Sequence, residues 1–151
     1  MTIESVRQWH KLARPVPTQR DFDVQLGCHL EEIAEMLEAL EFSNTYNPHK
    51  VQGDGTDLYR QLVKWADALK DGGYFAQITG RKEFLDSIAD QIVTGVGAAY
   101  CAGMDAGAAL REVNTSNWTK VDINTKNFTR DDNGKIMKPP GYKPPNLEGL
   151  Y

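Results

Sequence analysis

The segment from Gln19 to Phe42 places the tightest constraint on the fold, because its apolar residues recur every three or four positions. This spacing gathers them on one side of an α-helix, and the resulting stripe is typical of a helix that faces the core of a bundle. Thr18 precedes the segment and can act as its N-cap. The stripe consists of Phe22, Leu26, Leu30, Ile33, Leu37 and Leu40. Such a helix needs further helices to cover it.

Four more segments predict helices from their apolar spacing and their flanking residues. They are Ile3–Ala13, Leu58–Leu69, Arg81–Gly103, and a helix capped by Asp105 that runs to about Asn117. The stretch Ser43–Asp57 is rich in turn residues and predicts a loop. We therefore expect an all-α protein, a bundle of about five helices.

The chain changes character at Thr119, after which it is polar, rich in Gly, Pro and Lys, and without helical spacing. The one indication of extended structure there is a short piece around Val121–Phe128. We predict a single domain over residues 1–151, with residues 119–151 forming an irregular basic tail that closes on the site.

Composition and charge limit the possible partners. The chain has a formal net charge of −4, which argues against a protein that coats a nucleic acid polymer. No apolar run is suited to crossing a membrane, and the N-terminal MTIESVRQWHKL lacks the apolar core of a signal peptide. Cys28 and Cys101 lie far from any CxxC pair, which favours two buried free thiols in a reducing compartment. We expect a soluble cytoplasmic protein.

Carboxylates crowd one flank of the longest helix, in the stretch LEEIAEMLEALE. Glu31, Glu35 and Glu38 share that flank, and Glu32 lies about 60° beyond Glu35. No Lys or Arg occurs from residue 31 to 41, so local Glu–Lys pairing cannot offset the repulsion. The residues alone leave two readings at nearly even odds, a solvated face or a cage of oxygen ligands for Mg²⁺ or Mn²⁺.

The segment RKEFLDSIADQIVTGVG repeats this arrangement. Glu83, Asp86 and Asp90 fall within about 60° of one another, beside an expected core stripe. That stripe is formed by Leu85, Ile88 and Ile92. Two acidic faces beside two apolar stripes suggest helices whose carboxylates point at each other.

Cations and amides gather later in the chain. Asn114, Asn117 and Lys120 share one helical face, and Lys135, Lys138 and Lys143 follow on a proline-stiffened tail. Lysines there could neutralise a polyphosphate. Ordinary surface lysines on a solvated loop are the competing reading.

Four motifs, in this order, resemble the all-α nucleotide pyrophosphohydrolases, the MazG-like superfamily that also includes dimeric dUTPases and phosphoribosyl-ATP pyrophosphohydrolases. EEIAE is similar to the family's EExxE motif, and DSIADQIVTGVGAAYCAGMD resembles its second acidic helix. EVNTSNWTK resembles the ending of that region, and NGKIMKPPGYKPP resembles the tail of bacterial and phage members. The matches span Leu26 to Pro145.

The resemblance implies two or three Mg²⁺ or Mn²⁺ ions and cleavage of a nucleoside triphosphate to the monophosphate and pyrophosphate. Glu31 would be the catalytic base that deprotonates the attacking water. The metal ligands would be Glu32, Glu35, Asp86 and Asp90, and the substrate-binding residues would be Asn114, Asn117, Lys120, Lys135 and Lys138. A homodimer or homotetramer would be the assembly, in the host cytoplasm if the gene belongs to a phage.

The chain departs from the family pattern at Ser87, where the family has a glutamate. Asp86 is the expected replacement and Glu83 a weaker one, while Glu38 is a plausible extra ligand. The segment between the acidic motifs, around Ser43–Gly80, is also longer than usual, so the base could be a purine (dGTP, dATP) or a pyrimidine (dUTP, dCTP). The alternative is a non-catalytic nucleotide-binding or structural helical module.

Overall fold

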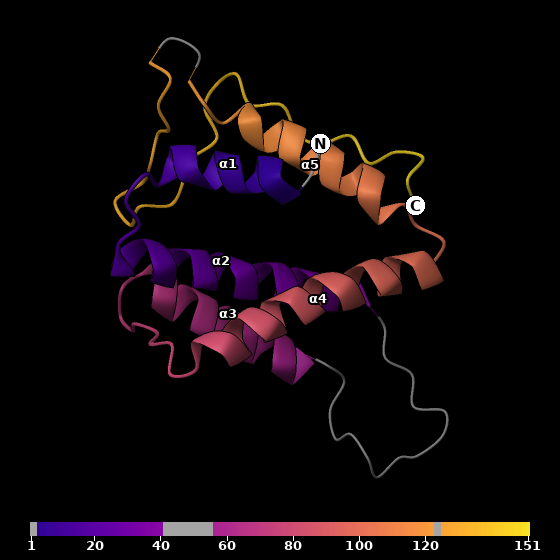
Figure 1. The fold of residues 1–151 in the computed structure, drawn as a ribbon, viewed down its shortest axis with the longest axis horizontal. Coiled ribbons are helices and arrows are strands. Elements are labelled where there is room, and N and C mark those ends of the chain that lie inside the picture. Colours follow the sequence, from indigo (N-terminus) through magenta and orange to yellow (C-terminus); the bar gives the residue numbers. More distant parts are fainter. Residues whose placement is uncertain (1–2, 41–55, 123–124) are drawn as a thin grey trace. The chain divides into compact units, whose positions relative to one another are not determined.

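The computed structural model describes residues 3–40, 56–122 and 125–151, and in these residues it is all-α (Figure 1). The five helices are α1 (Ile3–Ala13), α2 (Gln19–Glu38), α3 (Thr56–Lys70), α4 (Arg81–Cys101) and α5 (Ala106–Trp118). The predicted all-α class is confirmed, and a helix occupies each of the five segments for which one was predicted. Most of the predicted loop Ser43–Asp57 lies outside the described residues.

Two helices begin at an N-cap residue, whose side chain accepts a hydrogen bond from a backbone N–H of the first turn that has no partner within the helix. Thr18 accepts a hydrogen bond from the backbone of Asp21, whose carboxylate in turn accepts from the backbone of Thr18. Asp105 accepts from the backbone N–H of Ala108 at 2.8 Å. Both predicted caps are confirmed. The expected extended piece corresponds to an isolated antiparallel bridge between Val121 and Phe128.

The chain divides into two compact units. The first contains α1, α4 and α5 with most of the tail, over Met1–Val16, Gln77–Asp131 and Ile136–Tyr151. The second contains α2 and α3, over Pro17–Ala76, together with the short tail segment Asp132–Lys135.

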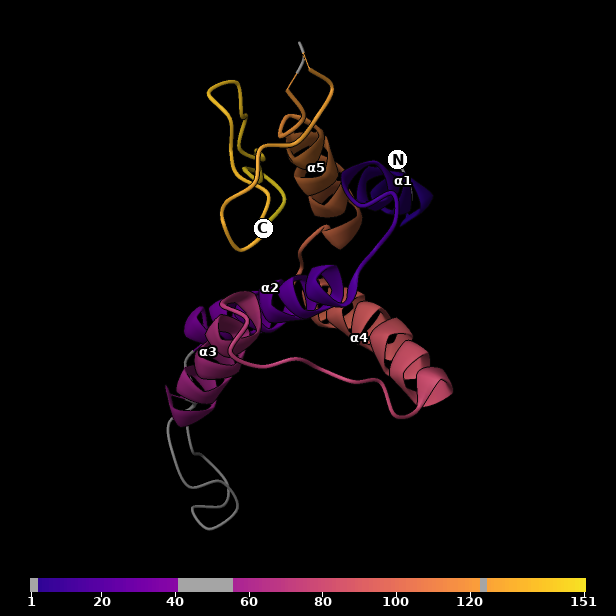
Figure 2. The same cartoon turned by 90° about the vertical axis from the view of Figure 1, so that its left-hand side faces the viewer.

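In the second unit, α2 and α3 lie side by side (Figure 2), and they approach most closely at Gly27 of α2. A Cβ atom built on Gly27 would lie 2.8 Å from the carbonyl oxygen of Ala66 and 2.9 Å from Cγ of Lys70. The lack of a side chain therefore lets the two backbones approach closely. The core here is small, and its buried apolar residues are Val24, Ala34, Ala66 and Leu69.

The face of α2 that packs on α3 is not the predicted leucine stripe. Gly27 and Ala34 are buried, whereas most of the stripe is half-buried and Leu40 is 51% exposed. On a helical wheel Ala34 and Gly27 lie about 40° and 60° from Leu30, on the flank of the stripe, and Glu31 lies about 40° beyond Gly27. Because small residues allow closer approach than leucine, the α2–α3 contact forms on the small face, with Glu31 at its edge.

In the first unit, α1 packs on α5 through one buried tryptophan and one buried amide. The Trp9 indole N–H donates to the carbonyl of Asn117 at 2.8 Å, and Asn114 Nδ2 donates to Ser5 Oγ at 3.0 Å. The tail runs along α5, since Leu150 accepts from the backbone of Asp105 at the start of the helix. At the other end, Lys143 accepts from Ser116.

No residue of α4 is buried. The predicted core stripe is therefore wrong in this structure, because Leu85 is 69% exposed, Ile92 is 48% exposed and only Ile88 is half-buried. The prediction of two buried thiols is wrong as well, since Cys28 is half-buried and Cys101 is exposed, although both are free. Among the described helices, none has the length and apolarity needed to span a membrane.

Candidate functional site

A pocket of about 130 Å³ lies between α2 and α3 and collects charged side chains from both helices. Its polar lining comes from Glu31 and Glu35 on α2 and from Tyr59, Asp67 and Lys70 on α3. Ala34, Val63 and Ala66 form the apolar part of the wall. The helix crossing at Gly27 thus sets the carboxylates of α2 against the last turns of α3.

Glu31 is the most tightly engaged of these carboxylates. Its Oε1 lies 2.9 Å from Nζ of Lys70, and its Oε2 lies 3.3 Å from Nζ of Lys135 in the tail. Lys70 also pairs with Asp67 at 3.2 Å and is only 14% exposed. Both oxygens of the predicted catalytic base are therefore held by ammonium groups.

These contacts set the ionisation of the pair. Burial alone would raise the pKa of Glu31, but the hydrogen bond from Lys70 and the charge of Lys135 outweigh it and hold the pKa below 4.5. Burial would lower the pKa of Lys70, but its contacts with Glu31 and Asp67 raise the pKa above 10.5. Both groups are charged at neutral pH.

The two lysines also offset the repulsion expected between the neighbouring carboxylates of α2. The stretch from Glu31 to Glu41 contains no basic residue, but Lys70 and Lys135 approach from 39 and 104 positions away. Cations from the chain itself therefore neutralise part of the acidic flank of α2.

The stabilisation of the folded state by the Lys70–Glu31 pair should be lost in acid. The depressed pKa of Glu31 stabilises the fold above pH 4.5, and this contribution disappears as the pH falls through the folded pKa. We expect Lys70→Met to lower the free energy of unfolding at pH 7. The difference in free energy of unfolding between wild type and variant should become smaller below pH 4.5. Urea denaturation in EDTA at several pH values measures that difference.

The matched control is Lys64→Met, at an exposed position of α3. Its difference in free energy of unfolding from wild type should stay the same from pH 7 to pH 3. If the difference in free energy of unfolding between Lys70→Met and wild type also stays constant from pH 7 to pH 3, the pair with Glu31 contributes nothing to stability.

The four predicted metal ligands lie at the surface. Glu32 and Glu35 are exposed on α2, and Asp86 and Asp90 are exposed on α4, as is Glu83. The two sets belong to different units. In the part of the chain that the structure describes, no group of three or more His, Cys, Asp or Glu side chains could hold a metal ion. The α2 carboxylates are donors of the kind that Mg²⁺ or Mn²⁺ prefers, but they do not form a complete ligand set alone.

The predicted substrate-binding residues fall into three environments. Asn114 is buried and bonded to Ser5, so its side chain joins α1 to α5. Asn117 and Lys120 lie half-buried at the end of α5, and Lys138 is exposed on the tail. Lys135 is the tail lysine that contacts Glu31.

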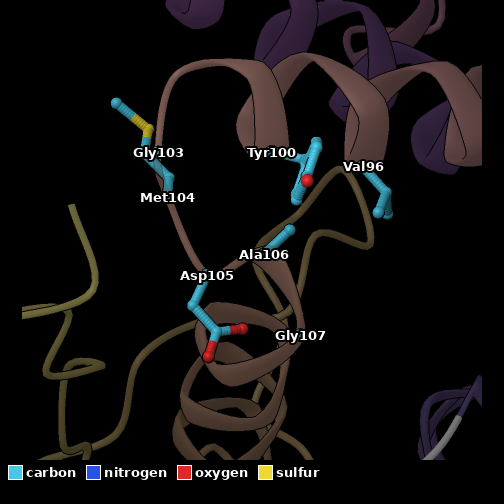
Figure 3. Close-up of a pocket in the computed structure, with 7 residues that line it drawn as sticks. All are labelled: Val96, Tyr100, Gly103, Met104, Asp105, Ala106 and Gly107. Carbon is cyan, nitrogen blue, oxygen red and sulfur yellow. The ribbon is translucent and has the colours of Figure 1, made fainter.

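A second pocket, of about 400 Å³, lies at the turn between α4 and α5 (Figure 3). Val96 and Tyr100 project into it from α4, and Asp105 lies at its α5 side. Asp105 already caps α5, and no predicted site residue lines this pocket.

Sequence reasoning missed Tyr59, Asp67 and Lys70. Asp67 and Lys70 stand three positions apart on α3, which places them on one helical face, but nothing in that spacing points to α2.

Comparison with protein-family models, curated proteins and solved structures gives no match.

Proposed function

We propose that this chain is a metal-dependent nucleoside-triphosphate pyrophosphohydrolase that converts a dNTP to the monophosphate and pyrophosphate. The ordered resemblance of its four motifs suggests this activity. The observation that carries it is the setting of Glu31, a carboxylate at a pocket edge that already attracts two cations. Such a pocket has the negative charge that divalent ions seek.

The proposal gives each residue a distinct task. Glu31 accepts the proton of the attacking water, a role that requires the ionised carboxylate present at neutral pH. The metal ligands are Glu32, Glu35, Asp86 and Asp90. Bound Mg²⁺ or Mn²⁺ would stabilise the charge that develops on the leaving pyrophosphate.

Cationic and amide side chains take the substrate. Lys120, Lys135 and Lys138 neutralise the phosphates, and Asn117 helps to place the nucleotide. Asn114, being buried and bonded to Ser5, would act by holding α1 on α5. The contact of Lys135 with Glu31 supports a tail that reaches the acidic flank of α2.

A homodimer or homotetramer is part of the proposal. Large apolar side chains of α4 stand in solvent, notably Leu85 at 69%, Val93 at 69% and Tyr100 at 81% exposure. Large apolar side chains exposed on one helix face favour association.

A non-catalytic nucleotide-binding or structural module is the second candidate. Its support is Ser87, which stands where the family has a ligand glutamate, and the engagement of Glu31 by two lysines. Such a module would bind a nucleotide without turning it over.

The deciding experiment measures pyrophosphate release from dGTP, dATP, dUTP and dCTP with Mg²⁺ or Mn²⁺, with EDTA as the blank. We expect metal-dependent release from at least one dNTP and equimolar monophosphate. Binding of nucleotide by a folded sample, with no release from any dNTP, would favour the non-catalytic module.

A further inference from the structure

A short piece of the tail, Asp132–Lys135, makes its contacts with α2 and α3 and belongs to the second unit, whereas the residues on either side of it belong to the first. We call this piece the tail tip. An antiparallel bridge between Arg130 and Ile136 closes the chain just outside it. Within it, Gly134 turns the chain with a φ of +85°, a conformation that favours glycine. The tail tip is therefore the loop of a small hairpin.

Arg20, in the first turn of α2, fastens the tail tip. Its guanidinium donates to the carbonyl of Leu69 at 2.6 Å and also to that of Lys70, the last two residues of α3. It donates as well to the carbonyl of Asn133 in the tail tip, at 3.2 Å. A guanidinium is a rigid plane of N–H donors, so the contacts with α3 fix the direction of the donor that reaches the tip.

Lys135 makes the second contact of the tail tip, with Glu31. Its Nζ lies 3.3 Å from Oε2 of Glu31, and the Lys135 side chain is 44% exposed. Lys70, which lies 2.9 Å from Oε1, is only 14% exposed. An exposed ion pair stabilises little and is screened by salt, whereas a pair shielded from water is screened much less. Lys70 is thus the permanent partner of Glu31, and Lys135 is the exchangeable one.

The contact with Lys135 conflicts with the task proposed for Glu31. A carboxylate takes a proton from water only when that water lies within hydrogen-bond distance of it. Each oxygen of Glu31 already faces an ammonium group, so Lys135 competes with the water for Oε2. Lys135 is also the lysine assigned to the phosphates, and one ammonium group cannot remain on Glu31 and serve them as well. The tail tip must therefore leave α2 before Glu31 acts.

We propose that the tail tip is a latch: Arg20 and Lys135 hold it on α2, where it shields Glu31, and it opens when Lys135 exchanges Glu31 for another partner. The latch rests on the proposed function for the role of Glu31 and for the polyphosphate that draws Lys135 away. Arg20 is a positioning residue, because it acts on Glu31 only through the tip. Opening of the latch then becomes a step in substrate binding.

Limited digestion of the full chain with trypsin, without nucleotide or metal, tests the latch. Trypsin binds the side chain that precedes the cleaved bond in its own specificity pocket, so the bond after Lys135 is cut only when Lys135 has left Glu31. The bonds after Lys138 and Lys143 precede prolines and resist trypsin. Mass spectrometry of the fragments gives the rate at each bond.

We expect slow cleavage after Lys135 in the wild type at low salt, and cleavage faster by about threefold or more in Glu31→Gln and in Arg20→Met. Added salt should bring the wild-type rate towards that of the variants, because it screens the ion pair. Glu38→Gln is the matched control. It changes an exposed carboxylate of the same helix and should leave the rate after Lys135 unchanged.

Two other bonds show whether the fold itself has opened. Lys126 is exposed in the tail outside the tip, and Lys64 is exposed on α3. Cleavage after these residues should be the same in all variants. A rate after Lys135 that neither the two variants nor salt changes would overturn the proposal. A rise after Lys135 matched by an equal rise after Lys64 would overturn it too, because the whole unit and not the tip would then be opening.

Kinetics on the best dNTP of the panel separates a latch from a merely structural role of Arg20. A closed tip lowers the apparent affinity by the fraction of molecules that are closed, so Arg20→Met should lower KM by about twofold or more and leave kcat within about twofold. An arginine that only supports the fold would not lower KM when it is replaced.

The digestion involves no turnover, so its outcome is separate from that of the hydrolase proposal. Protection of the Lys135 bond that Glu31→Gln removes, in a chain that cleaves no dNTP, would leave the latch standing and remove the enzymatic function. Cleavage of a dNTP by a chain whose Lys135 bond is cut equally fast in the wild type and in Glu31→Gln would do the reverse.

Discussion

Replacement of Glu31 by Gln should lower kcat for pyrophosphate release by about 10²–10⁴-fold, the contribution typical of a general base. The amide keeps the shape of the side chain but can neither accept the proton nor carry the charge that Lys70 and Lys135 engage. KM should change much less, because the proposed mechanism assigns the binding of the phosphates to Lys120, Lys135 and Lys138 and not to Glu31. Steady-state kinetics at saturating Mg²⁺, on the best dNTP of the panel, measures both constants.

The control for this variant is Asp57→Asn, an exposed carboxylate in the first turn of α3 that pairs with Arg60. Its kcat should match the wild type within about twofold. Glu31→Gln with wild-type kcat and an intact fold would remove Glu31 from the mechanism and leave a different base to be found.

Gly27→Ala should destabilise the second unit by about 1–2 kcal/mol, even though alanine is the better helix former. The new methyl group would lie 2.8 Å from a backbone carbonyl of α3, which cannot move without shifting the helix. Overpacking of this kind costs about 1–3 kcal/mol, against a gain of up to about 1 kcal/mol in helix propensity. Thermal denaturation followed by circular dichroism should show a melting temperature lower by several degrees.

Gly97→Ala in α4 is the opposite case. A Cβ built on Gly97 meets nothing within 4 Å, so only the propensity gain of up to about 1 kcal/mol remains. This variant should melt at or above the wild-type temperature. If both alanines shift the melting temperature in the same direction, the close crossing of α2 and α3 does not govern the effect.

Local sequence signals predicted the helices well. Thr18 and Asp105 start α2 and α5 because each accepts from a backbone N–H of the first turn, an interaction encoded within three residues. Pro15 and Pro17 follow the end of α1 at Ala13. Boundaries and fold class depend on such short-range chemistry, so the sequence alone could supply them.

Packing partners were harder to predict. The leucine stripe of α2 has the larger hydrophobic surface, yet Gly27 and Ala34 make the close contact with α3. Periodicity measures how apolar a face is, but it does not measure how closely another backbone can approach it. The pairing of Glu31 with Lys70 was missed for a related reason, because it depends on that crossing and on no local spacing.

The exposure of α4 has a consequence for when the helix is ordered. A helix that buries no residue depends on its own backbone hydrogen bonds and on the propensities of its residues. Val93, Thr94, Gly95, Val96 and Gly97 are poor helix formers in succession, so amide protons there should exchange with solvent early. Asp86 and Asp90 precede this weak stretch. Any ligand or partner that engages them must also supply the free energy that keeps α4 folded, so the order of α4 and the occupancy of its carboxylates become thermodynamically linked.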